Sequence, residues 1–512
     1  MSLPYIKEIF DPIYGFIELT DIEVNIIDTL AFQRLHNISQ LGTLHMVFPM
    51  ARNTRFAHSI GVLALIQKLI ENLKKIPSDR EAKELYDQLN KDQKQLIRIS
   101  GLLHDIGHLP FSHCTETVIK NYIITNYEDI KHEMKGADKF HEWLSGQIVK
   151  KTNIYNPSSS ETSIQDNRNE IRDIIMGNSE YNLFNQILHS ELDVDRMDYL
   201  LRDSYSTGLS FGLIDFNQIL RNLYVKEVSP IMEPASRDVI VCSPKSINAI
   251  DNFYFARMFM YNSVYYHKTK SYYDYLLSKS YEISITSENL DEISKFLPKK
   301  PDEILKPIIE NDDLNDDQSD DFFIEWNSFD DYYVWNSLRN CWRELISQSY
   351  NSLNDDLSKL KILLDRLFRR KKSNLIFEEN LLKTEPNKKS SKGKLDSVLA
   401  RGFEELKKWI KNELNDVYNN SLIVLYSDID APLKNIQEED PETVEDYEGN
   451  LVLFYDFDEE KFHYLHNINS SINYQHKKSK YHIFRVFNMK ESDDPEELRD
   501  IISKKFEELT EQ

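Results

Sequence analysis

The sequence has few of the residues that mark secreted, turn-rich or membrane-spanning proteins. Its 512 residues include only three cysteines, Cys114, Cys242 and Cys341, which are widely spaced and form no CxxC pair. This excludes a disulfide framework and predicts a reducing compartment. The 13 glycines and 16 prolines are few for this length and favour helices over a turn-rich all-β fold. No apolar run approaches membrane-spanning length, and the first residues do not resemble a signal peptide. We expect a soluble, cytoplasmic protein with no membrane contact.

Positive charge is also scarce. Lysine and arginine number 62 against 85 aspartates and glutamates, which gives a formal net charge of −23. This balance argues against a chain-wide surface for nucleic acid or anionic membranes, although a local basic pocket is compatible with it. Forty percent hydrophobic residues exclude full-length disorder.

The apolar pattern divides the chain into a long helical part and a shorter mixed part. Apolar residues recur at helical spacing from about 20 to 281, and again over 322–370. Near the C-terminus the pattern predicts three strands and a final helix, at 422–426, 451–455, 481–487 and 495–509. We therefore predict a mainly α protein with a smaller C-terminal α+β lobe.

Two charged segments separate these parts. The acidic run 310–321 predicts a solvated loop or linker, and the basic residues 369–372 and 388–394 predict a mobile loop, with a polyanion contact as the alternative. The expected domains are a helical core at 1–285, an acidic linker or loop at 286–330, a helical segment with the basic loop at 331–420, and the small α+β lobe at 421–512.

An adjacent histidine and aspartate are the most informative feature of the sequence. His104 and Asp105 end an apolar helix and precede Gly107 and His108. Adjacent helical side chains splay about 100° apart, yet both can reach one ion near the end of a helix. A neutral imidazole together with a carboxylate suits a divalent transition metal.

Two further elements complete a candidate metal site. His58 begins an amphipathic helix on its core-facing stripe, and a buried histidine needs a partner. Glu191, Asp195 and Asp198 share one helical face, which is costly to bury without a cation. An ion pair between Asp198 and Arg202 would satisfy part of this row. Each element alone fits ordinary core histidines and solvated carboxylates equally well, but the three together favour a metal.

Seven motifs occur in the order of a known family. They are FQRL at 32–35, QLG at 40–42, VFP at 47–49, TRFAHS at 54–59, HDIGHLPFSH at 104–113, HE at 141–142 and VDRMDY at 194–199. Over residues 5–280 the chain thus resembles the HD-domain superfamily of metal-dependent phosphohydrolases. Within it, the chain looks most like the deoxynucleoside triphosphate (dNTP) triphosphohydrolases, which include dGTPase-like proteins. The resemblance implies an HD-domain helical core at 1–285.

The resemblance also implies a metal centre and a catalytic group. One divalent ion per active site, Mn²⁺, Mg²⁺, Fe²⁺ or Zn²⁺, would be held by His58, His104, Asp105 and Asp195, with Asp193 and Asp198 as competing choices for the last. The implied catalytic residues, which line the α-phosphate, are His108, His113, Glu116 and His141. Glu116 stands where the family often has aspartate, and a histidine–carboxylate pair is a sensible acid–base device. Ordinary polar packing is the alternative for His113 and His141.

The substrate residues follow in the same way. Those implied are Gln40, Leu41, Arg55, Arg196, Tyr199, Asp203, Arg257 and Tyr265. The three arginines would contact the triphosphate, because guanidinium suits bidentate phosphate binding. The ring of Tyr265 would pack against the deoxyribose and exclude a 2′-hydroxyl. Gln40 and Leu41 would read the 3′-hydroxyl and the 2′ face of the sugar, and Asp203 would hold the 3′-hydroxyl as well.

The function that the resemblance implies is hydrolysis of dNTPs to deoxynucleoside and inorganic triphosphate. A homo-oligomer and a nucleotide activator would be in keeping with the family. The chain departs from the family at several positions; Ala57, for example, precedes the first ligand histidine where the family often has glutamate. Because of such departures, the resemblance does not imply a base preference or nucleotide activation for this chain. The alternatives are another HD phosphohydrolase acting on single-stranded nucleic acid or a different nucleotide, and a nucleotide-sensing subunit without turnover.

Overall fold

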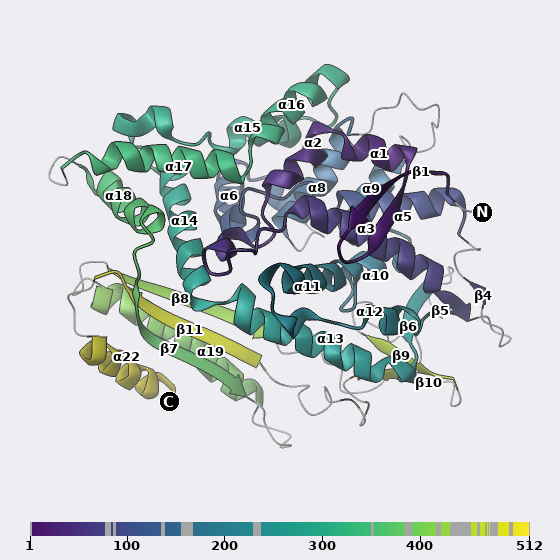
Figure 1. Ribbon diagram of the computed structural model, residues 1–512. Helices are drawn as coiled ribbons and strands as arrows, with labels where there is room; N and C mark the ends of the chain where they lie inside the picture. Colours follow the sequence, from purple (N-terminus) through teal and green to yellow (C-terminus); the bar gives the residue numbers. More distant parts are fainter. Residues whose placement is uncertain are drawn as a thin grey trace. The chain divides into compact units, whose positions relative to one another are not determined.

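The computed structural model describes residues 3–76, 83–84, 89–134, 139–154, 167–228, 237–349, 353–383, 392–415, 421–430, 452–457, 461–465, 468, 471, 480–490 and 495–510. Over these residues the protein is mainly helical with a few small sheets (Figure 1), which confirms the predicted fold class. The chain divides into two compact units: unit 1 comprises 1–367 and 437–468, and unit 2 comprises 368–436 and 469–512. None of the helices in the described part combines the length and apolar character needed to cross a membrane.

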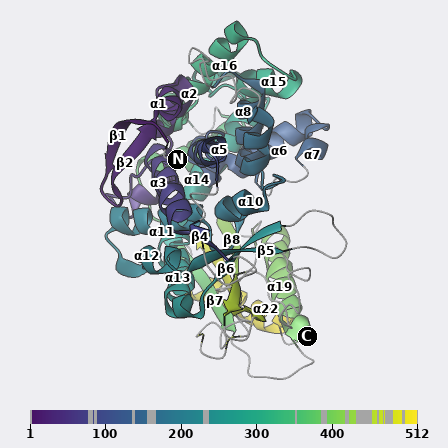
Figure 2. The ribbon, with the colours of Figure 1, turned by 90° about the vertical axis from the view of Figure 1, so that its right-hand side faces the viewer.

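Unit 1 begins with an antiparallel hairpin to which the sequence analysis assigned no element. Strands β1 (Tyr5–Asp11) and β2 (Gly15–Thr20) pair along their length. The Asp11 carboxylate closes their turn by accepting the N–H groups of Ile13 and Tyr14. Both ribbon views place the hairpin beside α1 (Asp21–Ile27), which starts at a capping box of Thr20 and Glu23 (Figures 1 and 2).

Four helices of unit 1 carry, or directly precede, the predicted metal ligands and His141. They are α3 (Arg55–Asn72), α5 (Lys91–Leu103), α8 (Phe140–Lys151) and α11 (Val194–Thr207). Helix α3 is buried along most of its length and packs against both α5 and α11. Side-chain caps fix where α3, α5 and α11 begin, because Thr54, Asn90 and Asp193 each accept the N–H of the residue three positions on.

Further helices surround these four. They are α2 (Leu30–Gln33), α6 (His113–Asn126), α7 (Ile130–Glu133), α9 (Arg168–Ile175), α10 (Asn182–His189), α12 (Phe216–Leu220), α13 (Ile247–Met260), α14 (Lys268–Thr286), α15 (Pro301–Glu310), α16 (Asp316–Ser328), α17 (Asp331–Ile346) and α18 (Asp355–Phe368). Single turns add η1 (Arg34–Asn37), η2 (Gly42–Met46), η4 (Ser210–Gly212), η5 (Pro244–Ser246), the π-helix η6 (Tyr261–Tyr265) and η7 (Asp291–Phe296).

A six-stranded sheet corrects the expectation of helices alone between 20 and 281. Its order is β10-β9-β6-β5-β3-β4. The strands are β3 (Lys74–Ile76), β4 (Lys83–Glu84), β5 (Leu223–Val228), β6 (Arg237–Cys242), β9 (Leu453–Asp456) and β10 (Lys461–Tyr464). The predicted strand at 451–455 is thus β9, but it pairs in parallel with β6 of unit 1 rather than within a C-terminal lobe.

The secondary structure of the acidic segment also differs from the expected loop or linker. Most of 301–328 is helical, as α15 and α16. Asn315 caps α16, and Asp316 and Asp317 follow in its first turn, where negative charge interacts favourably with the helix dipole. The buried side chains of the same helix, Phe322 and Trp326, anchor it to the core. The expected domain boundaries at 285, 330 and 420 remain proposals.

Unit 2 is a small α+β structure. Its three-stranded antiparallel sheet has the order β7-β11-β8, formed by Asn374–Lys383, Lys480–Asn488 and Leu422–Asp430. Helices α19 (Lys392–Trp409) and α22 (Pro495–Thr510) and the π-turn η9 (Ile410–Leu414) accompany it, and Phe403, Phe484 and Leu498 lie in their common core. The predicted strands at 422–426 and 481–487 and the helix at 495–509 are confirmed, whereas β7 was not foreseen. Much of the basic run 388–394 falls outside the described residues, so its role stays a prediction.

Candidate metal centre

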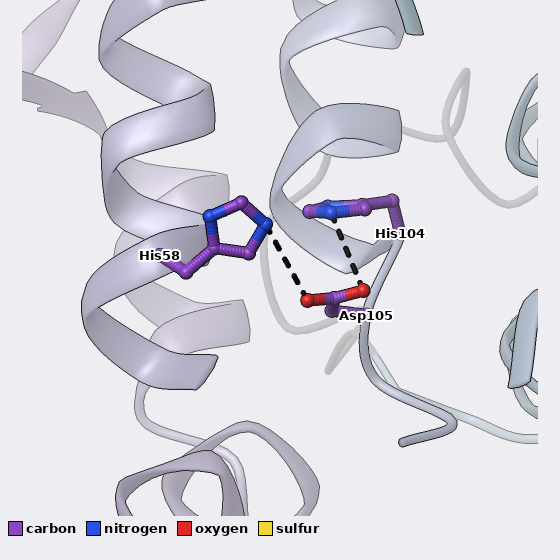
Figure 3. A group of neighbouring side chains, drawn as sticks. All are labelled: His58, His104 and Asp105. Atoms are coloured by element: carbon purple, nitrogen blue, oxygen red, sulfur yellow. Dashed lines mark ion pairs between the residues drawn. The ribbon is translucent and has the colours of Figure 1, made fainter. Parts of the chain in front are cut away.

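Two histidines and one aspartate form the centre of the site. His58 lies in the first turns of α3, and His104 and Asp105 follow directly after α5. The Nε2 atoms of His58 and His104 lie 3.6 Å and 3.4 Å from the two Asp105 oxygens (Figure 3). One ligand atom from each residue lies within 4.8 Å of the others. The three side chains are therefore close enough to bind one ion.

Asp195 supplies a fourth donor from α11. Its Oδ1 lies 2.9 Å from His58 Nε2, so the structure places the fourth predicted ligand beside this group of three. The competing aspartates have other partners. Asp193 caps α11 and pairs with Arg196 at 2.6 Å, and Asp198 lies 2.7 Å from Nδ1 of His58. This arrangement favours Asp195 over both alternatives.

The chemistry of the donors fits a divalent cation. The Nε2 atom of His104 is buried without a hydrogen-bond partner, and Nε2 of His58 faces the carboxylates of Asp195 and Asp105. His104 donates from Nδ1 to the Gly101 carbonyl at 2.8 Å, which leaves the lone pair on Nε2 available to a ligand. Burial alone would lower the pKa of His58, but the carboxylates of Asp195 and Asp198 raise it to about 10. The site thus holds positive charge at His58 that a metal ion would replace.

A second set of contacts orients the donors. Arg202 of α11 donates to both oxygens of Asp198, at 2.9 Å and 3.0 Å, and also reaches Asp11 of the hairpin at 2.9 Å. Asp198 in turn fixes the ring of His58. Such outer carboxylates set the tautomer and direction of a ligating histidine. Neither the role of Asp198 as a support nor that of Asp11 was foreseen from the sequence.

Arg55 belongs to this inner network. It was predicted to contact the triphosphate, and its guanidinium lies 2.8 Å from Asp105 and 3.0 Å from the Ser112 hydroxyl. Burial alone would raise the pKa of Asp105, but Arg55, followed by His104 and His108, holds it well below its usual value. Asp105 is therefore an ionised carboxylate facing the histidines.

A histidine–glutamate cluster adjoins the candidate metal centre. Glu116 of α6 bridges Nδ1 of His113 at 2.7 Å and Nδ1 of His141 at 2.8 Å. Burial alone would raise the pKa of Glu116, but His141 and His113 hold it well below its usual value. His108 stacks on His141 with ring centroids 3.9 Å apart, and its Nε2 lies 3.2 Å from Asp105. The structure thus brings the four predicted catalytic residues together, and Glu116 contacts both His113 and His141.

The predicted sugar-binding residues form a further group. The Tyr265 hydroxyl, on the π-helix η6, donates to Asp203 at 2.8 Å, and the Tyr199 ring packs edge-on against Tyr265. Asn53, which the sequence analysis missed although it precedes the TRFAHS motif, also donates to Asp203 at 2.7 Å. Burial raises the pKa of Asp203 to about 6, against the effect of these two donors. Gln40, which is also predicted to contact the sugar, is buried.

The remaining predicted residues are also placed by the structure. Leu41 is buried directly before η2. Arg196 pairs with Asp193, and Arg257 of α13 lies 3.4 Å from Glu191. Glu191 was expected on the inward face of the Asp195 helix, but α11 begins only at Val194, so this expectation was wrong. Each of the two arginines thus has a carboxylate partner.

Comparison with known proteins gives three levels of similarity. Residues 55–203 match the family model of the HD domain. An uncharacterised protein of Methanocaldococcus jannaschii is 33% identical over 350 residues, which are 68% of this chain and 61% of that protein. A deoxynucleoside triphosphate triphosphohydrolase SAMHD1 homolog of Dictyostelium discoideum is 30% identical over 302 residues, 57% of this chain and 52% of that protein.

The chain therefore spans between about half and three fifths of the length of these curated relatives. A solved structure is similar over a longer stretch. The crystal structure of a hypothetical protein from Aquifex aeolicus covers 98% of this chain and 99% of its own, with a TM-score of 0.59 at 21% identity. At this identity the likeness concerns the fold alone.

Proposed function

Since the chain carries an HD domain at residues 55–203, we propose that it is a metal-dependent phosphohydrolase that splits dNTPs into deoxynucleoside and inorganic triphosphate. The observation that carries the proposal is a group of three side chains that could hold an ion, His58, His104 and Asp105, next to a His–Glu–His cluster. The contact of His108 with Asp105 joins the two. The name of the Dictyostelium relative supports the substrate class.

The metal ligands of this proposal are His58, His104, Asp105 and Asp195. A divalent ion bound there would supply Lewis-acid polarisation of a phosphoryl oxygen. Two imidazoles with two carboxylates suit several first-row metals, so the donor set does not select one. The chain's own contribution is to hold these donors close to one another, with His58 and Asp105 buried.

Proton transfer is assigned to the His–Glu–His cluster. The Glu116 carboxylate accepts hydrogen bonds from Nδ1 of both His113 and His141. The Nε2 atom of each ring can therefore face the reacting group. In its protonated form, such a ring would donate its Nε2 proton to the leaving 5′-oxygen. The Glu116 carboxylate would stabilise the charged ring, against the burial that lowers the pKa of His113. The side chain of His113 is 58% exposed, so it lies where an incoming substrate can reach it.

The remaining residues bind and select the substrate. Arg196 and Arg257 offset the charge of the triphosphate, for which guanidinium groups give bidentate contacts. Above its pKa of about 6, Asp203 is an ionised acceptor for the 3′-hydroxyl. The ring of Tyr265, held by Asp203, would occupy the space of a 2′-hydroxyl and so disfavour ribonucleotides.

Anion-exchange analysis of the reaction products tests the proposal. The purified protein would be incubated with each dNTP, each ribonucleotide and a short single strand, with Mn²⁺ or Mg²⁺, and compared with Asp105→Ala. We expect triphosphate and deoxynucleoside from dNTPs only, and at least a thousandfold less from the variant, because it lacks a metal ligand. A shortened strand with intact dNTPs would move the protein to the nuclease alternative. Nucleotide binding without any product would indicate a sensor.

A further inference from the structure

The loop from His108 to His113 has a backbone that ordinary residues avoid. Phe111 and Ser112 have φ angles of 59° and 51°, in the region that favours glycine. Neither residue is glycine, and the loop joins two of the proposed catalytic histidines. Surrounding contacts must hold such a conformation in place.

One buried carboxylate contacts this loop and a second loop at the same time. Oδ1 of Asp331 accepts the Phe111 N–H at 2.5 Å, and its Oδ2 accepts the Ser39 N–H at 3.0 Å. Ser39 precedes Gln40 and Leu41, the residues proposed to read the sugar. The Ser112 hydroxyl donates to the Ser39 carbonyl at 2.7 Å and links the two loops directly.

The residues before Asp331 hold the other end of the same loop. The buried guanidinium of Arg34 donates to the His108 carbonyl at 2.7 Å and to the Phe329 carbonyl at 2.8 Å. It also lies over the Trp326 ring, 3.8 Å from its centroid. The chain from Trp326 to Asp331 thus supports the histidine loop at its start through Arg34 and at Phe111 directly. This part of the chain lies far beyond residue 203, where the HD match ends.

We propose that Asp331 is a positioning residue of the active site. Its two carboxylate oxygens fix the histidine loop against the Ser39 loop, so that the groups acting on the phosphate keep their place relative to those that read the sugar. The functional part of this proposal rests on the proposed function, whereas the structural part does not. Asparagine at this position could accept only one of the two N–H groups, and alanine could accept neither.

Hydrogen exchange followed by mass spectrometry tests the structural part without any assay of activity. The peptide spanning 109–115 would be compared among the wild type, Asp331→Asn and Asp331→Ala. The matched control is Asp330→Asn. Asp330 caps α17 by accepting the Tyr333 N–H at 2.8 Å, and asparagine caps equally well. This control removes a neighbouring charge near Arg34 but keeps the contacts of Asp331. Unchanged exchange in peptides from α3 shows that each variant is folded.

We expect exchange at 109–115 to rise about tenfold or more in Asp331→Ala, by less in Asp331→Asn, and not at all in Asp330→Asn. In the hydrolysis assay, kcat should fall in the same order by a similar factor, with a smaller change in KM. Exchange in Asp331→Ala as slow as in the wild type would overturn the proposal, as would an equal rise in Asp330→Asn. If the wild type hydrolyses no dNTP but the exchange pattern appears, the positioning role stands and the proposed function fails.

Discussion

At the scale of single residues, His58 shows how this site is built. Its two ring nitrogens face different aspartates of α11, with Nε2 toward Asp195 and Nδ1 toward Asp198. Only the Nε2 atom also faces His104 and Asp105. Asp195 therefore lies where it could bind the same ion, whereas Asp198 lies where it orients the ring. In the proposed assignment, the same helix supplies a metal ligand and its support three residues apart.

Replacing Asp198 tests this division of roles. We expect Asp198→Asn to weaken metal binding tenfold to a hundredfold, because the amide no longer attracts the Nδ1 proton of His58 as a carboxylate does. Calorimetric titration of the metal-free protein with Mn²⁺ measures the change. The matched control is Asp193→Asn, since Asp193 caps α11 and asparagine caps it equally well. An equal loss of affinity in both variants would contradict the assignment.

The pKa of Asp203 predicts a pH dependence of substrate binding. Burial raises this pKa to about 6, so the carboxyl becomes protonated as the pH falls through that value and accepts the 3′-hydroxyl less well. KM for dNTPs should therefore rise below about pH 6. In the unfolded chain the pKa is near 3.9, so the same shift lowers stability as the pH rises from about 4 to about 6.

The KM of Asp203→Asn should lack the rise at low pH that Asp203 causes, although other groups in the site still titrate. The informative quantity is the ratio of the KM of the variant to that of the wild type, measured from pH 5 to pH 8. A ratio that stays constant over this range would contradict the assignment of Asp203 as the 3′-hydroxyl acceptor.

How much of the site could be predicted depended on where each residue's partners lie in the sequence. Short motifs predicted His58, His104, Asp105 and Asp195 as a group, and the structure places them together, though their roles remain a proposal. The support from Asp331 could not be predicted, because its partners Ser39 and Phe111 lie hundreds of residues earlier. A lone aspartate at the start of a helix gives no signal of such a contact.

At the scale of elements, the site depends on the close approach of residues 104–107, which follow α5, to helix α8. A Cβ added at Gly107 would lie 2.4 Å from the Ser145 nitrogen and 2.7 Å from the His141 carbonyl oxygen. Both are backbone atoms, so a side chain at 107 would push α8, and His141 with it, away from the metal centre. The Gly107 N–H donates to the Ser145 hydroxyl at 2.9 Å in the present arrangement.

Gly107→Ala should therefore destabilise the protein by about 3 kcal/mol and abolish most hydrolysis. Gly208→Ala is the control. Gly208 ends α11 at a φ of 74°, but a Cβ there would meet nothing within 4 Å. The control should cost only about 1 kcal/mol, from the left-handed backbone, and keep its activity. Urea unfolding and the product assay measure the two effects, and a Gly107→Ala protein as stable and active as the control would refute the close-approach argument.

Elements with a clear periodicity of apolar residues could be predicted from the sequence, whereas short elements could not. The apolar spacing of α3 and α5 predicted both helices, and alternation predicted β11. Strands β5 and β6 are six residues each, within a region of helical character, and their pairing partners include β3 and β9 from distant parts of the chain. The start of α16 was missed because its acidic residues, taken as a sign of solvated loop, also suit the first turn of a helix.

At the scale of the whole molecule, unit 1 is completed by a segment from late in the sequence. Strand β9 pairs with β6, and Leu453, Tyr455 and Tyr464 share a core cluster with Val239 and Val241. The chain thus leaves unit 1 at residue 367 and contributes to it again at 437–468. A strand predicted locally does not reveal the sheet that it joins, because the pairing is a long-range contact.

Leu453→Ala should consequently destabilise unit 1. The side chain is 1% exposed, and removing a buried leucine typically costs about 2 to 5 kcal/mol. We expect faster hydrogen exchange in a peptide covering β6, at 237–242. The matched control is Leu498→Ala, which removes an equally buried leucine from the core of unit 2 and should loosen α22 instead. Unchanged exchange at 237–242 in Leu453→Ala would contradict the place of β9 in unit 1.

The most direct test of the central claim is the identity of the inorganic product. The metal-loaded protein would be incubated with an equimolar mixture of the four dNTPs, and the products followed by phosphorus NMR. The account predicts inorganic triphosphate as the first and only phosphorus product, formed together with deoxynucleoside and absent with Asp105→Ala. Release of orthophosphate or pyrophosphate in its place would contradict it.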